Sequence, residues 1–104
     1  MKFVLISRHT GGKGPSPSEQ QQLMTDLGNW LALLQNPTAI PVRSGKSVTS
    51  AKIEDYSGEV GGVILFEAES LEQAASLAQK SPGLKFGWTH DVFPEISVES
   101  AAQN

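Results

Sequence analysis

Acid–base chemistry could be carried by His9, His90 and Asp91, which we take as the candidate catalytic residues. A carboxylate beside an imidazole fixes the tautomer of the ring and raises its basicity, as a general base requires. His90 and Asp91 are adjacent in the sequence, so their side chains point to opposite sides of an extended chain. A working pair would therefore join His9 to Asp91, or His90 to Glu59, across neighbouring strands.

The candidate ligand-binding side chains are cationic, acidic or aromatic: Arg8, Lys13, Tyr56, Glu59 and Trp88. Arg8, Lys13 and the free amides at a helix start near residues 16–18 would favour an anionic or carboxylate-bearing ligand. The alternative interpretation is a set of solvated loop residues with no role in catalysis. Two histidines and two carboxylates could ligate zinc, but no HxH or HxxE spacing is present. We therefore expect no metal site and no cofactor.

The segment from His9 to Ser16, HTGGKGPS, is rich in glycine and contains a proline, which excludes regular secondary structure. It is either a plain connection or a loop that contacts a phosphate or another anion. The segment matches neither the Walker A pattern nor the dinucleotide fingerprint, so the motif alone identifies no ligand.

Composition excludes several classes of protein. The 104 residues include 8 basic and 11 acidic side chains, for a net charge of −3, and the basic residues are scattered, so we expect no nucleic-acid partner. No apolar run approaches the roughly 20 residues that span a bilayer, so we expect no membrane association. The start, MKFVLIS, is too short for a secretory signal, which favours the cytoplasm. The absence of cysteine excludes disulfides and thiolate chemistry.

Two segments have apolar residues on both of their alternating faces, as strands that are buried on both sides do: residues 2–7 and 63–68. Ser16, Pro17 and Glu19 form a capping box with proline at the first helical position, so a helix starts there. Its apolar stripe is Leu23, Leu27, Trp30, Leu31 and Leu34, and Asn36-Pro37 predicts its end near Gln35. We expect Trp30 in the core.

Ser70 caps a second helix with Gln73 in the capping-box position. Its small inner face, Ala74, Ala75 and Ala78 with Leu71 and Leu77, would let it lie close to a sheet, and Ser81-Pro82-Gly83 ends it. Residues 38–58 predict a strand or an irregular hairpin, with alternation at 40–43 and 47–53 and a turn at 44–46. We expect a connection over 84–93, a last strand over 95–98 and a flexible tail over 99–104.

The resulting order, β-α-β-β-α-β, predicts one α+β domain over residues 1–98 with the ferredoxin-like fold: an antiparallel sheet, central first and third strands, and two helices on one face. The central strands are also apolar on the uncovered face, which would leave a large exposed patch. We expect a second copy to cover it, sheet against sheet, in a homodimeric α+β barrel. The alternative is a monomer whose residues 38–58 fold over the sheet.

The segment VGGVILFEAESLEQAASLAQKSPGL, with the N-terminal MKFVLIS and the glycine-rich loop, resembles the YCII-related family, including its DGPF-type branch. The resemblance implies a ferredoxin-like fold and a dimeric barrel. Some family members are thought to use a His–Asp pair; here the first helix lacks histidine and Ser81 stands where the aspartate is expected. Asp55-Tyr56-Ser57-Gly58 stands where the DGPF branch has its motif.

Two functions remain open from the sequence. One is a small enzyme or binding protein that acts on an anionic or phenolic molecule in a pocket at one pole of the sheet, where the first strand ends and the third and fourth begin. The other is a non-catalytic module that binds a metabolite or a partner protein, or serves as a structural dimer. The broken His–Asp signature motivates the second.

Overall fold

The two most apolar segments form neighbouring central strands, β1 (Lys2–His9) and β5 (Val60–Glu67), which pair antiparallel. The structure is a computed structural model that describes residues 1–102. Strand β2 (Gln35–Pro41) flanks β5 and strand β6 (Trp88–Pro94) flanks β1, so the sheet order is β2-β5-β1-β6 and every pair is antiparallel. This is the predicted ferredoxin-like α+β topology.

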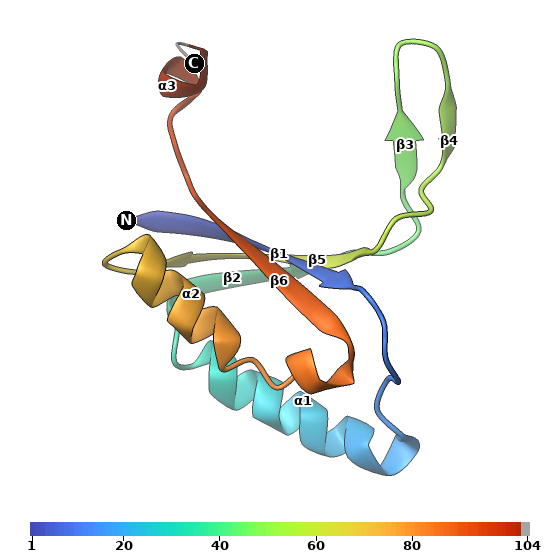
Figure 1. Cartoon of the computed structure of the whole chain (residues 1–104), viewed down its shortest axis with the longest axis vertical. Helices are drawn as coiled ribbons and strands as arrows, with labels where there is room; N and C mark the ends of the chain where they lie inside the picture. Colours follow the sequence, from blue (N-terminus) through green and yellow to red (C-terminus); the bar gives the residue numbers. More distant parts are fainter. Residues whose placement is uncertain (103–104) are drawn as a thin grey trace.

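Helices α1 (Pro17–Leu31) and α2 (Leu71–Gln79) both lie on one side of the sheet (Figure 1). The predicted capping box of α1 is formed, because the Ser16 hydroxyl accepts from the Glu19 amide and the Glu19 carboxylate accepts from the Ser16 amide. The Ser70 hydroxyl caps α2 by accepting from the Gln73 amide. Both helices therefore begin where their polar cap residues predict.

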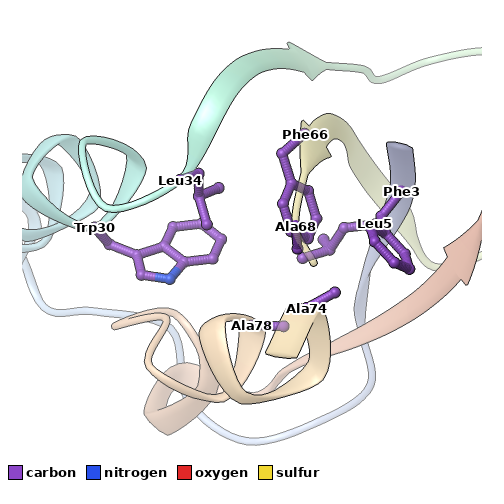
Figure 2. Packing of buried hydrophobic residues seen from close by; sticks show 8 residues of the cluster. All are labelled: Phe3, Leu5, Trp30, Leu34, Phe66, Ala68, Ala74 and Ala78. Atoms are coloured by element: carbon purple, nitrogen blue, oxygen red, sulfur yellow. The ribbon is translucent and has the colours of Figure 1, made fainter. Parts of the chain in front are cut away.

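The core lies between the helices and the sheet. Its members are predominantly large apolar residues on the strands and α1 and alanines on α2 (Figure 2): Phe3, Leu5, Trp30, Leu34, Phe66, Ala68, Ala74 and Ala78. Phe3 and Leu5 are fully buried, and Trp30 is 4% exposed, which confirms its predicted core position. The alanines let the backbone of α2 approach the sheet closely.

The first helix ends earlier than predicted. It stops at Leu31, and the segment expected to end it belongs to strand β2. Asn36 adopts a left-handed backbone with φ of 50°, where the pairing of β2 with β5 is irregular, and Pro37 follows. Proline is tolerated here because β2 is an edge strand that pairs on one side only.

Residues 38–58 contain both of the predicted alternatives, a strand and a hairpin. After β2, the short strands β3 (Lys46–Val48) and β4 (Ile53–Asp55) pair with each other in a separate two-stranded sheet. The turn expected at 44–46 is not the turn of this hairpin, which lies between Val48 and Ile53, inside the alternating segment 47–53. The hairpin projects away from the main sheet and does not cover it (Figure 1).

The last strand is also misplaced by the sequence prediction. Strand β6 occupies residues 88–94 and so takes up the second half of the segment 84–93 expected to be a connection; a short 3₁₀ turn, η1 (Leu84–Phe86), precedes it. The predicted strand over 95–98 is wrong; the chain leaves the sheet there and enters α3 (Val98–Ala102). This helix takes up part of the predicted tail, and residues 103–104 lie outside the described residues. His90 and Asp91 therefore lie within a strand.

Candidate functional site

The pairing of β1 with β6 decides which candidate side chains can meet. His9 lies opposite Trp88, Ser7 opposite His90 and Ile6 opposite Asp91. Opposed residues share a face of the sheet, and successive residues alternate between faces. His90 and Trp88 consequently lie on the face that the helices cover, whereas Asp91 lies on the open face.

On the open face, Arg8 joins β1 to β6 through Asp91. The Arg8 Nε donates to one carboxylate oxygen of Asp91 at 2.5 Å, and Nη2 donates to the other at 3.2 Å. Glu59 lies 3.9 Å from Arg8 Nη1 on the other side. This bidentate geometry is the strong form of an arginine–carboxylate contact.

This contact shifts both titrations. The hydrogen bond from Arg8 is the largest effect on Asp91 and holds the pKa of that carboxyl below its usual range, with partial desolvation opposing it. The same hydrogen bond raises the pKa of Arg8, and Glu59 adds to the effect. Asp91 is therefore an ionised hydrogen-bond acceptor committed to Arg8, which makes it a poor proton acceptor at neutral pH.

On the helix face, His90 stacks on Trp30 of α1. The ring centroids are 5.8 Å apart and the planes differ by 12°. The indole N–H of Trp30 donates to the carbonyl of Leu77 at 2.9 Å, which holds the indole between α2 and β6. The resulting environment of the imidazole is aromatic and largely apolar.

The two ring nitrogens of His90 are buried and neither has a hydrogen-bond partner. Desolvation by burial is the main cause that lowers the pKa of His90. The charge of Asp91 opposes this shift. A buried imidazole N–H without a partner costs about 1–3 kcal/mol, so this site holds polar atoms that no described protein group satisfies.

His90 lines an open pocket of about 640 Å³ between α2 and β6. Its walls combine apolar residues with a few hydroxyl and amide groups: Leu71, Ala75, Ser76, Ala78, Gln79, Leu84, Trp88, Thr89, His90 and Val92. The volume falls within the range of about 300–1,000 Å³ that is usual for small-molecule sites.

Trp88 forms one wall of this pocket and is held from three sides. The ring of His9 meets its indole edge-on, with centroids 5.2 Å apart. A β-carbon at Gly83 would lie 3.6 Å from the indole, and one at Gly61 would collide with the far end of the ring. Gly61 lies where the pairing of β5 with β1 is irregular, so the bulge makes room for the indole.

Lys13 lies apart from the histidines. It lines a second open hollow with the start of α1, Lys85 and Phe86. The Glu19 carboxylate already accepts the hydrogen bond from the Ser16 amide there, which lowers the pKa of Glu19. The N-terminal end of the glycine-rich loop is held by two hydrogen bonds, which the amides of Thr10 and Gly11 donate to the carbonyl of Gly87. The loop is thus a connection that is fastened to the start of β6.

Neither of the expected histidine–carboxylate pairs is formed within residues 1–102. Asp91 contacts Arg8 on the open face, and Glu59 lies beside Arg8, while both histidines lie on the helix face. Tyr56 accepts a hydrogen bond from the Val60 amide at 3.2 Å near the same pole. In the described part of the chain, no group of three metal-ligating side chains lies close enough to hold an ion.

Sequence reasoning missed the contribution of the helices to this site. The stacking of Trp30 on His90 joins positions 60 residues apart, and no local motif signals it. The alternation of Trp88, His90 and Val92 is a period-2 pattern that could have revealed both the strand and the shared face.

No helix in residues 1–102 has the length and apolar character needed to cross a membrane.

Comparison with known proteins identifies a similar fold. No protein-family model matches the sequence, and no curated protein matches it either. Among solved structures, 5-chloro-2-hydroxyhydroquinone dehydrochlorinase (TftG) from Burkholderia phenoliruptrix AC1100, in complex with 2,5-dihydroxybenzoquinone, is similar with a TM-score of 0.53 and 16% identity. The match covers 96% of this chain and 98% of that chain.

A second structure, a hydantoinase/carbamoylase family amidase from Burkholderia ambifaria, matches with a TM-score of 0.31 and 12% identity, over 88% of this chain and 26% of that chain. A TM-score this low does not show that the two chains share a fold. The comparisons therefore show that this chain shares the α+β fold of the dehydrochlorinase along nearly its whole length.

Proposed function

We propose that this protein binds a small hydroxylated aromatic molecule in the pocket between α2 and β6, with His90 as the polar contact. The observation that carries the proposal is the buried, unpartnered imidazole of His90 beside an open pocket. Both ring nitrogens are covered in this structure, so the imidazole would have to turn toward the pocket before a ligand hydroxyl could supply the missing hydrogen bond. Trp88 would provide an aromatic wall for a planar ring. Leu84 and Val92 supply apolar contact.

The state of His90 suits a phenolic ligand. Burial lowers its pKa, so the ring is neutral at neutral pH and presents one donor and one acceptor nitrogen. The oxygen of a phenol can both donate and accept a hydrogen bond, so it can pair with either nitrogen of the neutral imidazole. The acceptor nitrogen could also take the phenolic proton, so the same contact serves binding alone or general-base catalysis.

The fold comparison suggests which ligand to try first. The similar dehydrochlorinase is named for a chlorinated hydroxyhydroquinone, and its structure contains 2,5-dihydroxybenzoquinone. We propose that this chain is a YCII-related protein that takes ligands of the same chemical class. Binding without turnover, as in a metabolite-binding module, is the alternative that the broken His–Asp signature favours.

The test measures binding of 2,5-dihydroxybenzoquinone and hydroquinone by calorimetry and thermal shift. His90→Phe keeps a ring to stack on Trp30 and removes both nitrogens. We expect it to weaken binding at least about tenfold, since a lost hydrogen bond of about 1.4 kcal/mol corresponds to that factor. Incubating the wild type with the bound ligand and following its absorbance separates turnover from binding.

His9→Phe is the matched control. It removes the nitrogens of the other histidine while keeping an aromatic edge against Trp88, so we expect affinity to stay within about twofold. Equal affinities of wild type and His90→Phe, or no binding of either probe by the wild type at millimolar concentration, would refute the proposal.

A separate observation favours a homodimer, which we also propose. The open face of the sheet carries large apolar side chains from three strands, among them Ile40, Leu65 and Phe93, which are 44%, 39% and 51% exposed. A second copy that packs its own open face there would cover them in an α+β barrel. Light scattering with size exclusion should give about twice 11.1 kDa, and Leu65→Lys should give the monomer mass.

We also propose a cytoplasmic location for the protein, which fractionation of the source cells would test.

A further inference from the structure

Two segments rise from the sheet on the side opposite to α1 and α2 (Figure 1). One is the β3–β4 hairpin, residues 46–55, which we call the hairpin arm. The other is the chain that leaves β6 and ends in α3. They flank the open face at its two ends, so that a body placed on this face would lie between them.

The root of the hairpin arm is fixed to the sheet. The Tyr56 amide donates to the carbonyl of Gly45 at 2.9 Å, and the Tyr56 hydroxyl accepts from the Val60 amide at 3.2 Å. The ring of Tyr56 lies where a β-carbon at Gly58 would collide with it, so glycine at this position permits the contact. The direction of the arm is therefore set by specific contacts at its base.

The tip of the arm carries apolar side chains with nothing to cover them. Val48 and Ile53 lie opposite each other across the hairpin, and each is 70% exposed. The other flanking segment carries Ile96 and Val98, which are 55% and 85% exposed. A two-stranded hairpin with strands this short is marginally stable alone in water, so packing against a further surface would stabilise it.

The size of the sheet face indicates what the arms would add to a dimer interface. Four strands of seven or eight residues present a flat face on the order of 500 Å², from a strand spacing of about 4.8 Å and a rise of about 3.3 Å per residue. A stable interface usually buries about 800 Å² on each partner. The flat extent of the sheet face is smaller than this, and apolar surface on the arms would enlarge the interface.

We propose that the hairpin arm clasps a second copy of this chain, burying Val48 and Ile53 against the partner. The inference rests on the homodimer proposed above and adds which segment completes its interface. In a two-fold dimer each copy gives one arm and receives one, so the contact occurs twice and each substitution counts twice. The arm follows Ile40 and Val42 in the chain, and these two side chains are also exposed, at 44% and 42%.

The test measures the dimer dissociation constant by analytical ultracentrifugation for the wild type and for Val48→Ser/Ile53→Ser. Both side chains are exposed in the monomer, so the double variant should keep the monomer stability and raise the dissociation constant at least about tenfold. Met24→Ser, on the exposed side of α1, is the matched control because Met24 is 64% exposed and lies on the helix side; we expect no change.

A second measurement locates the arm directly. Because the chain has no cysteine, a single cysteine at position 48 can carry a benzophenone photocrosslinker, with position 24 as the control site. We expect crosslinked dimers from position 48 and none from position 24. A wild type of monomer mass would overturn the homodimer itself. A dimeric wild type whose dissociation constant stays within twofold in the double variant, with no crosslink from position 48, would overturn the clasp alone.

Discussion

The imidazole of His90 lies nearly parallel to the indole of Trp30, with the ring centroids 5.8 Å apart. Trp30 comes from α1 and His90 from β6, so this contact joins the first helix to the last strand. It buries a titratable ring, and the loss of solvation disfavours the charged form. The relationship makes the protonation of His90 a measure of how well the helix layer is docked on the sheet.

The pKa of His90 should be below its ordinary value of about 6.5. Because the folded state disfavours protonation, the unfolded state binds the proton more readily at low pH. Stability should be at its full value above pH about 6.5 and should fall as the pH drops through the folded-state pKa of His90. NMR titration of the two histidines gives the pKa, and chemical unfolding at several pH values gives the stability. A pKa above 6.5 for His90, or an unchanged pH dependence in His90→Phe, would contradict this.

Asp91 should add a second pH dependence of stability, at a lower pH than that of His90. Arg8 lowers its pKa, so its contribution is present above the unfolded value of about 3.9 and is lost as the pH falls through the folded-state pKa. Asp91→Asn should lower the melting temperature at pH 7 and leave it unchanged at a pH below both pKa values. Glu54→Gln, on the exposed hairpin arm, is the control. A uniform loss at all pH values would assign the effect of Asp91→Asn to packing instead.

Gly87→Ala should destabilise the fold by about 1–3 kcal/mol. Gly87 has a left-handed backbone with φ of 91°, and a β-carbon there would collide with the carbonyl of Gly11. The substitution would force the glycine-rich loop away from the start of β6. Gly14→Ala in the same loop is the control, because its β-carbon would meet nothing within 4 Å. Urea unfolding distinguishes the two, and equal stabilities would show that the loop is not fastened at Gly87.

Two phenylalanines test the two faces of the sheet. Phe3→Ala removes a fully buried side chain from the helix face and should cost about 3–5 kcal/mol of the free energy of unfolding. Phe93→Ala, at 51% exposure on the open face, should cost less than about 1 kcal/mol when the protein is diluted to monomer. The measurement is urea unfolding at nanomolar to micromolar concentration. If Phe93→Ala costs as much as Phe3→Ala in the dilute protein, the open face is already covered within one chain.

Much of the architecture was predictable because β1 and β5 are apolar on both faces and both helices begin with a serine cap. The edge strands were less predictable for a physical reason. β2 contains Pro37, which an edge strand tolerates because it pairs on one side only, and β6 contains the polar residues His90 and Asp91. Their composition therefore resembled that of loops.

The site was predictable only as a region. Arg8, Glu59 and Asp91 meet at the expected pole, but the alternation of β1 and β6 separates them from both histidines. Which histidine becomes buried depends on how α1 docks on the sheet, and the contact between Trp30 and His90 has no local sequence signal. The fastening of residues 10–11 to Gly87 likewise depends on the path of a distant strand.

The indole of Trp88 reaches from the turn at Gly83 across the end of β1 to Gly61 in β5. Trp88 therefore lies against Gly83 at the pocket wall and against Gly61 at the bulge, beyond which Arg8 lies opposite Val60. A molecule that displaced this indole would leave a gap beside the bulge, next to the strand position of Arg8, whose carboxylate partner Asp91 lies on the open face.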